Sequence, residues 1–570
     1  MRRLLLIGLA AIVGLTLAVP FSAGAQSQQT TSSATAQQTT STTEYVVLYK
    51  DLASAAAAKA AIKAAGGQVI RENTKIGLAT VRSGNANFIT AVAGQTGVAG
   101  AARNRVIGQA PGRGAPKRNR IETEGTKGQG AAAKGAADAG DRPGHEPLAD
   151  KQWGMRMINA TPSGSYRIHQ GRRSVMVGIM DTGIDGRHPD LRANFNRRLS
   201  RNFTTDIPLV DGPCEDEPDR SCSDPAHVDE NGHGTHVAGI VGAPINRLGV
   251  AGVAPKVTLV NIRAGQDSGY FFLDATINAF VYAGDVGLDV VNMSFFTDPW
   301  LFNCPTDPTA TPAEQIEQRT VIAATQLAVG YARGRGVTLV SSLGNEATDL
   351  GRPTVDVISP DFPPGNERER EVNNSCLTMP TEARGVIGVS ALGPSGRKAY
   401  YSNYGLERTD VAAPGGDRRD FFGTPQYDTP ENRILSTYPR SVLEEEGLLD
   451  ERGIPTDPLV LRDCRGSVCG YYRYLQGTSM ASPHAVGVAA LIVSRYGQPD
   501  RPGRGFTLSP ARTERILKAT AEDTPCPSPP TLVYPDPDLE GLSATCEGTL
   551  ERNGFYGFGV VDAMSAVIRL

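Results

Sequence analysis

Short runs of consecutive apolar residues alternate with longer helical segments from about residue 148 onward. Four of these runs have the length of a strand: 175–180, 257–260, 290–293 and 337–340. Unbroken hydrophobicity, as opposed to strict alternation, is typical of parallel strands that are buried on both faces. The helical segments between them, such as 277–284 and 323–334, suit right-handed crossover connections. The pattern therefore predicts an α/β domain whose largely parallel sheet carries helices on both faces.

Residues 44–108 show a different pattern, in which shorter strands and helices follow one another closely. Strands are expected at 45–49, 68–70 and 76–81, and an Ala-rich helix at 52–65 ends at Gly66 and Gly67. Residues 88–106 supply a second helix and a closing strand. We expect a small α+β domain here, separate from the larger one.

Two polar segments flank this small domain. Residues 26–43 are almost entirely Gln, Ser, Thr and Ala, and residues 109–147 are rich in Gly, Ala and charge. Such compositions cannot bury enough apolar surface to fold, so both segments are expected to be linkers. The basic residues of the second linker, among them Arg113 and Arg120, are expected to be open to proteolysis.

The first 25 residues have the three parts of a secretory signal peptide. Arg2 and Arg3 precede an apolar run, Leu4 to Val19, and Ala23-Gly24-Ala25 offers a small-residue cleavage site. The run contains two glycines and falls short of the roughly 20 residues that a membrane-spanning helix needs. We expect cleavage after Ala25, export of a secreted, extracellular protein, and no association with a membrane.

Composition and charge narrow the possible partners. The chain has 570 residues, 40% of them hydrophobic, which excludes a wholly disordered protein, and its 64 Gly and 39 Pro favour a loop-rich globular one. The net charge is −3, but residues 45–150 carry 15 Lys and Arg against 8 Asp and Glu. The remainder is therefore acidic overall, and nucleic acid is not expected as a partner.

Eight cysteines, all beyond residue 200, fit an exported protein with disulfides. Eight cysteines allow about 105 pairings, so the sequence alone leaves the connectivity open. Short separations favour Cys214–Cys222, Cys464–Cys469 and Cys526–Cys546, which leaves Cys304–Cys376. The sequence contains no Cys-x-x-Cys pair, which argues against zinc bound through cysteine.

Four polar clusters stand where a predicted strand ends or a helix begins. They are Ile179-Met180-Asp181-Thr182-Gly183-Ile184-Asp185, Asn231-Gly232-His233-Gly234-Thr235-His236-Val237-Ala238-Gly239, Ser341-Ser342-Leu343-Gly344-Asn345-Glu346 and Gly477-Thr478-Ser479-Met480-Ala481-Ser482-Pro483-His484. Open α/β sheets carry their sites at the carboxyl ends of the strands. A serine hydroxyl becomes a useful nucleophile only beside a base, and histidine has a pKa suited to that role.

In this order the four clusters resemble the signatures of the subtilisin family, the subtilases, over about residues 148–570. The resemblance implies a subtilisin-like fold and gives Ser479 as nucleophile, His233 as base and then acid, and Asp181 as the carboxylate that orients the imidazole. It gives the Asn345 amide and the Ser479 backbone N–H as oxyanion donors. Residues 44–108 more weakly resemble the family's inhibitory and chaperone propeptide.

The resemblance extends to substrate binding. Ser294, in the stretch after the strand at 290–293, and Gly344 are expected to contribute to the substrate cleft. Where the family usually has Leu-Gly, Phe295 and Phe296 follow Ser294, so no side-chain preference is transferred. Candidate insertions at 297–318, 349–375 and 416–470 are mostly polar and Pro-rich, and we expect rim loops there.

Metal binding is the remaining open point. Asp190 and Asn246 match family positions that contribute to a stabilising calcium site, and oxygen ligands on loops are what calcium requires. The alternative is that both residues only shape turns, with Arg247 adding a positive charge nearby. Zinc held by His233 and His236 is disfavoured, because no Glu lies between them and no third ligand is evident. No cofactor is expected to be needed for catalysis.

Together these features predict a secreted serine endopeptidase, made as a zymogen and acting as a monomer on proteins or peptides, with its own propeptide as inhibitor. Cleavage within 109–150 would release the mature enzyme. Two alternatives stay open: a catalytically silent, peptide-binding subtilase fold, and a processing protease of narrow specificity.

Overall fold

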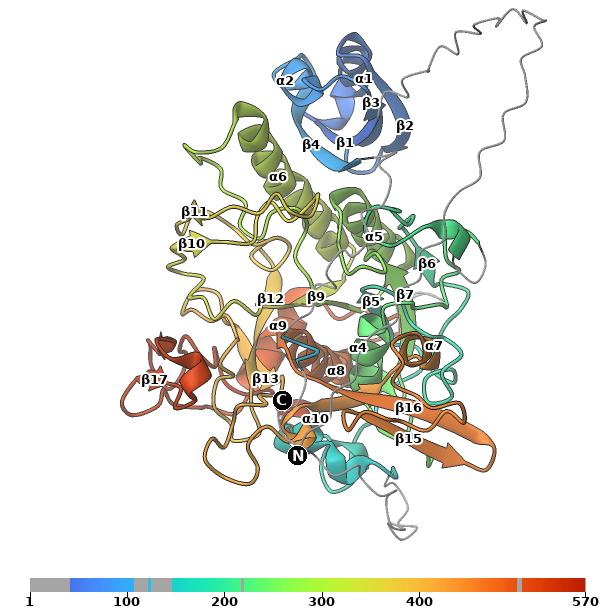
Figure 1. The fold of residues 1–570 in the computed structure, drawn as a ribbon, viewed down its shortest axis with the longest axis vertical. Helices are drawn as coiled ribbons and strands as arrows, with labels where there is room; N and C mark the ends of the chain where they lie inside the picture. The colour runs from blue at the N-terminus through green and yellow to red at the C-terminus, as the bar shows by residue number, and fades with distance from the viewer. Residues whose placement is uncertain (1–41, 107–120, 125–145, 217–219, 500–504, 569–570) are drawn as a thin grey trace, which may run out of the picture. The chain divides into compact units, whose positions relative to one another are not determined.

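The computed structural model describes residues 42–106, 121–124, 146–216, 220–499 and 505–568 (Figure 1). The predicted signal peptide and most of both predicted linkers lie outside the described residues. Among the helices of the described part, none combines the length and apolar character needed to cross a bilayer.

A seven-stranded sheet forms the centre of the large domain, in the order β13-β12-β9-β8-β5-β7-β6 (Figure 1). Every neighbouring pair is parallel. The strands are β5 (Met176–Met180), β6 (Arg201–Asn202), β7 (Thr258–Arg263), β8 (Val290–Met293), β9 (Thr338–Ser342), β12 (Val386–Leu392) and β13 (Val411–Pro414). The predicted parallel α/β architecture is confirmed.

Helices cover both faces of this sheet. On one face lie α4 (His233–Gly242) and α8 (Thr478–Tyr496), and on the other lie α5 (Leu273–Val286) and α6 (Pro312–Gly334). Successive β5 side chains point to opposite cores, so that Val177 and Ile179 belong to the first and Met176 and Met180 to the second. Two buried faces explain why the strand is apolar without interruption.

Residues 43–106 form the predicted small α+β domain. Its antiparallel sheet has the order β2-β3-β1-β4, and its helices pack on one face. The elements are β1 (Thr43–Tyr49), α1 (Ala55–Ala64), β2 (Gly67–Asn73), β3 (Leu78–Ser83), α2 (Phe88–Val92) and β4 (Val98–Val106). The other face contributes Val46 and Leu78 to the same apolar core as Phe280 of α5 and Val321 of α6.

The rim-loop expectation was wrong in two places. Helix α6 starts at Pro312, inside the candidate insertion 297–318, because Thr311 and Glu314 form a capping box ahead of its first turn. The segment 416–470 contains α7 (Arg440–Glu445), β14 (Ile434–Thr437) and β15 (Val460–Arg465), and both strands pair with β16 (Val468–Leu475). Buried tyrosines of β16, Tyr472 and Tyr474, anchor this antiparallel sheet to the main core.

The remaining elements lie around the large domain. They are α3 (Trp153–Met157), β10 (Val355–Asp356), β11 (Arg370–Glu371), α9 (Pro510–Ala519), β17 (Thr531–Val533), β18 (Ser543–Thr545) and α10 (Ala563–Ile568). The described residues contain four disulfides, namely Cys214–Cys222, Cys304–Cys376, Cys464–Cys469 and Cys526–Cys546. The pairing favoured by short separations is confirmed.

Candidate active site

Asp181 and His233 meet at the carboxyl end of the sheet. Asp181 follows the last residue of β5, and His233 is the first residue of α4. The imidazole Nδ1 lies 2.7 Å from Asp181 Oδ1, and both side chains are buried. A β-carbon on Gly234 would lie 2.1 Å from the carbonyl oxygen of Gly183, so only glycine lets α4 approach this closely.

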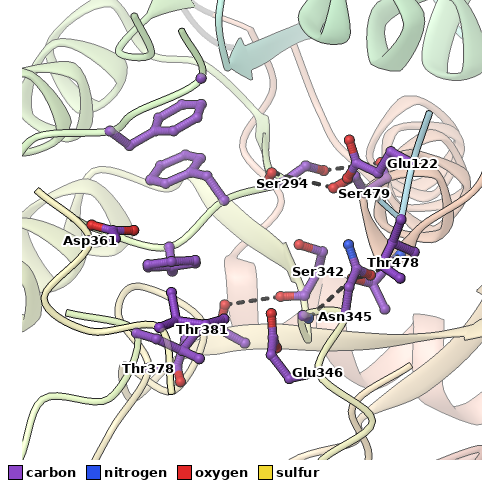
Figure 2. Close-up of a pocket in the computed structure, with 18 of the residues that line it drawn as sticks. Glu122, Ser294, Ser342, Asn345, Glu346, Asp361, Thr378, Thr381, Thr478 and Ser479 are labelled. Carbon is purple, nitrogen blue, oxygen red and sulfur yellow. Dashed lines mark hydrogen bonds between the residues drawn. The ribbon is translucent and has the colours of Figure 1, made fainter. Parts of the chain in front are cut away.

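Ser479 lies in the first turn of α8 and lines one cleft together with His233. Gly477 precedes the helix with φ +153°, a conformation that favours glycine. The Ser294 hydroxyl donates a hydrogen bond of 3.1 Å to the backbone carbonyl of Ser479, and the Ser479 hydroxyl donates one of 3.5 Å to the Ser294 carbonyl (Figure 2). Ser294 thus contacts the nucleophile candidate directly, in addition to lining the cleft.

The side chain of Asn345 is fixed by its neighbour Thr478. Its Oδ1 accepts hydrogen bonds from the Thr478 backbone N–H and hydroxyl, each 2.9 Å long (Figure 2). With the oxygen engaged there, the Nδ2 end of the amide is left to donate. Gly344 also lines the cleft, but its N–H donates to the Thr478 hydroxyl and its carbonyl accepts from the Asn403 backbone N–H.

The cleft itself has a volume of about 680 Å³ and mixed walls. Phe271 and Phe295 stack with ring centroids 4.0 Å apart and form part of an apolar wall, to which Phe296 and Leu301 also belong. Hydroxyl groups form another part, where Thr381 donates to the Ser342 carbonyl (Figure 2). The two residues that depart from the family pattern, Phe295 and Phe296, therefore border the cleft.

A short segment of the predicted linker, residues 121–124, enters this cleft, which sequence reasoning did not anticipate. Glu122 Oε2 lies 3.4 Å from His233 Nε2, the nitrogen that faces away from Asp181. A β-carbon on Gly477 would lie 3.1 Å from Glu122 Oε1 and 3.5 Å from Asn345 Nδ2, so both groups border one glycine. The Glu122 carboxylate thus lies against the predicted catalytic groups. The segment is also held by its backbone, because the Ile121 carbonyl accepts a hydrogen bond from Gln476 Nε2.

Charge around His233 favours the imidazolium. Burial by itself disfavours a charged imidazole, but the Asp181 and Glu122 carboxylates together hold the pKa of His233 well above its ordinary value. A protonated His233 cannot accept the proton of the Ser479 hydroxyl. This conformation therefore disfavours the neutral imidazole that a general base requires, an arrangement that we call the resting state.

The two other histidines of the sequence motifs are packed inside the protein. His236 Nε2 lies 3.0 Å from the Arg473 carbonyl and 3.1 Å from the Ile434 carbonyl, and burial lowers the pKa of His236 to about 3. His484 Nδ1 lies 2.8 Å from the Met480 carbonyl. Both rings serve the packing of their helices.

The structure brings Asp190 and Asn246 together, but in contact with one another. Asn246 donates to Asp190 Oδ1 at 2.8 Å, and Oδ2 accepts from the Val250 N–H and the Tyr472 hydroxyl, each 3.1 Å long. Calcium takes about six to eight oxygen ligands, whereas here both carboxylate oxygens of Asp190 accept hydrogen bonds from neutral donors. Calcium binding stays a prediction. Glu146 braces the same loop by accepting the backbone N–H groups of residues 246 and 248, each at 2.8 Å.

A group of three carboxylates that the sequence did not reveal lies elsewhere, at Asp206, Asp224 and Asp267. Within the described residues it is the only cluster of three or more potential metal ligands that lie close together. The buried Arg263 guanidinium pairs with all three, at 2.5 Å from Asp224, 2.8 Å from Asp267 and 3.7 Å from Asp206. Burial and the neighbouring carboxylates raise the pKa of Asp206 to about 6.

Comparison with known proteins places these features in a family. Residues 172–559 match the Subtilase family, Peptidase_S8. Subtilisin DY from Bacillus licheniformis is 28% identical over 61% of this chain and 84% of its own length. The nisin leader peptide-processing serine protease NisP from Lactococcus lactis is 27% identical over 61% of this chain, a match that spans 44% of that protein.

Solved structures agree on the fold. The epidermin leader peptide processing serine protease from Staphylococcus aureus superposes with a TM-score of 0.58 at 19% identity, covering 92% of this chain and 98% of that chain. Fervidolysin from Fervidobacterium pennivorans superposes with a TM-score of 0.52 at 21% identity, covering 92% of this chain and 61% of that chain.

Proposed function

Because the chain belongs to the subtilase family of serine proteases, we propose that it is a secreted serine endopeptidase made as a zymogen. The observation that carries this proposal is the 2.7 Å contact between His233 Nδ1 and Asp181 in a cleft that Ser479 and Asn345 also line. Two other clefts, of about 280 and 560 Å³, are lined by neither a serine nor a histidine.

The proposed reaction is acyl transfer to Ser479. The hydroxyl attacks the peptide carbonyl while His233 Nε2 takes its proton, and a bond forms between Oγ and the carbonyl carbon. Asp181 keeps the other ring nitrogen protonated and stabilises the imidazolium. His233 then gives the proton to the departing amine, and water repeats the cycle on the acyl-enzyme.

The negative charge that develops on the substrate carbonyl oxygen would be stabilised by hydrogen bonds from the Asn345 Nδ2 group and the Ser479 backbone N–H. The fixed position of Asn345, bonded twice to Thr478, supports this role, because a donor held in place before reaction does not have to be reoriented. The start of α8 adds the positive end of a helix dipole to the same place. No cofactor takes part in this scheme.

The zymogen part of the proposal rests on two contacts. Arg103 of the small domain binds the buried Glu317 of α6 through its backbone N–H, Nε and Nη2, at 2.8, 3.1 and 2.9 Å. Further along the chain, Glu122 lies against His233. Both contacts would be lost when cleavage of the linker beyond residue 124 allows the small domain and residues 121–124 to leave.

The test is labelling with a serine-directed phosphonate. The processed wild-type protein should form one covalent adduct at Ser479, and Ser479→Ala should form none. An unlabelled wild type of intact fold would reject the proposal and favour the catalytically silent, peptide-binding alternative.

A second candidate function is that of a processing protease with narrow specificity, because such proteases occur among the relatives. Two of them are named as leader peptide-processing proteases. If this chain resembles them in activity, a peptide library should show cleavage at a few sites only. Rapid, broad digestion of casein would favour a degradative enzyme instead.

A further inference from the structure

A second carboxylate of the segment 121–124 is bound outside the main cleft. The Glu124 carboxylate accepts hydrogen bonds from Arg418 Nε and Nη2, each 2.7 Å long, and from the Tyr400 hydroxyl at 2.7 Å. Arg419 Nη2 lies 3.6 Å away. Two parallel bonds from one guanidinium edge are the geometry by which arginine selects a carboxylate.

The two arginines of the pocket around Glu124 are held in place by other carboxylates. Arg418 Nη1 pairs with Asp428 at 3.1 Å, and Arg419 Nη1 pairs with Asp536 at 2.5 Å. The Arg418 side chain is only 1% exposed. Within the described residues, Glu124 accepts the hydrogen bonds from Nε and Nη2 of Arg418. This edge of the guanidinium would therefore be available to another carboxylate once Glu124 has left.

Gln476 connects the pocket to the nucleophile candidate three residues later. Its Oε1 accepts from the Arg418 backbone N–H at 2.8 Å, and its Nε2 donates to the Tyr400 hydroxyl at 3.2 Å. The same Nε2 donates to the Ile121 carbonyl at 3.0 Å. One side chain thus holds the backbone of a bound peptide segment and the wall of the pocket that binds its acidic side chain.

We propose that Arg418, Arg419 and Tyr400 form a specificity subsite, the acid subsite, which binds an Asp or Glu side chain of a peptide substrate. The inference rests on the proposed function, and it names the substrate class: peptides with an acid near the cleaved bond. Glu124 fills the acid subsite in the intact chain. After the segment leaves, the buried donors of Arg418 are unpaired, which is unfavourable, and a substrate carboxylate restores their bonds.

The first experiment measures preference in the processed wild-type enzyme. Peptides that differ only by Glu or Gln at one position, scanned along the sequence around the cleaved bond, are compared by kcat/KM. At one position we expect Glu to be favoured over Gln by about 10- to 100-fold, as charge-assisted hydrogen bonds imply. In Arg418→Met and in the milder Tyr400→Phe this ratio should fall, whereas Arg440→Met, a change at an exposed arginine on α7, should leave it unchanged.

The second experiment does not depend on catalysis. In the full chain with Ser479→Ala, which keeps the linker intact under the proposed mechanism, hydrogen exchange is followed at residues 121–124. Adding Glu124→Gln should speed exchange of these amides by about tenfold or more, because the bidentate contact is lost. The control change Glu367→Gln, at an exposed acid of the main cleft, should have no such effect.

The outcomes separate the two proposals. Unchanged exchange in Glu124→Gln would overturn acid recognition, whether or not the protein is a protease. Faster exchange with equal cleavage of Glu and Gln peptides at every position would overturn the substrate role. A wild type that neither cleaves peptides nor reacts with the phosphonate would reject the proposed function, while the exchange result still decides whether the pocket selects a carboxylate.

Discussion

Replacing Glu122 by Gln should lower the pKa of His233 in the intact chain. The two side chains are 5% and 6% exposed, and their charged atoms are 3.4 Å apart, so water screens the interaction poorly. An opposite charge within about 4–6 Å typically shifts a pKa by about 1 to 3 units. We therefore expect the pKa of His233 to fall by about 1 to 3 units, or about 1.4 to 4 kcal/mol of interaction with the imidazolium.

The sign of the pH dependence follows from the same contact. The pKa of His233 is raised while residues 121–124 occupy the cleft. The contact with Glu122 therefore stabilises this occupied state fully at any pH below the pKa that His233 has after the segment has left. This stabilisation is lost as the pH rises through the raised pKa of His233, because the imidazole then loses its charge. Self-processing of the wild type should therefore accelerate with pH across this window, and Glu122→Gln should already process faster at its acidic end.

The assay is an NMR titration of the imidazole resonances in the Ser479→Ala background, with His233→Ala to assign the signal. Glu367→Gln serves as the control, because it removes one negative charge from the same cleft without contacting His233. If Glu122→Gln moves the His233 titration no further than Glu367→Gln does, the electrostatic account of the resting state is refuted.

Three further changes probe other parts of the structure. Asn345→Ala should reduce kcat by about 100- to 1,000-fold, the loss known for the corresponding donor of subtilisin itself, and leave folding intact; an unchanged kcat would remove Asn345 from the oxyanion site. Arg103→Ala should release the small domain from the processed complex about tenfold faster, since a partly exposed pair with the buried Glu317 contributes about 1 to 2 kcal/mol; equal release rates by surface plasmon resonance would contradict this. Replacing Cys304 and Cys376 by Ala opens a loop of 72 residues and should lower the free energy of unfolding in urea by about 4 kcal/mol; a loss below about 1 kcal/mol would show that this loop is already ordered in the unfolded chain.

Much of the fold could be predicted because its signals are local. The apolar run of β5 is continuous since both of its faces are buried, and the glycines at 66 and 67 end a helix that does stop at Ala64. The start of α6 was missed although Thr311 and Glu314 carried the signal, because the Pro-rich surroundings favoured a loop. The strands of 416–470 were missed because the segment has a mostly polar composition, and the buried tyrosines that anchor their sheet, Tyr472 and Tyr474, lie beyond it on β16.

In the candidate site, too, some residues could be predicted from the sequence and others could not. Asp181, His233, Ser479 and Asn345 each belong to a contiguous motif, so they could be named before their distances were known. Glu122 belongs to no motif, and the sequence places it in a segment with the composition of a linker. Its position beside His233, like that of Glu124 against Arg418, 294 residues later, depends on polar contacts that hydrophobic periodicity does not encode.

Under the proposed maturation, the hydrogen bonds of Glu146 would limit how far the amino end of the released enzyme can be trimmed. Its carboxylate ties the start of the large domain to the backbone of residues 246 and 248, and the Leu148 N–H donates to the Gly249 carbonyl close by. A cut between residues 125 and 145 would leave these hydrogen bonds intact, so we expect no loss of stability from a terminus in that range. A cut beyond Glu146 would strip the acid from its loop, which makes this residue a natural stopping point for maturation.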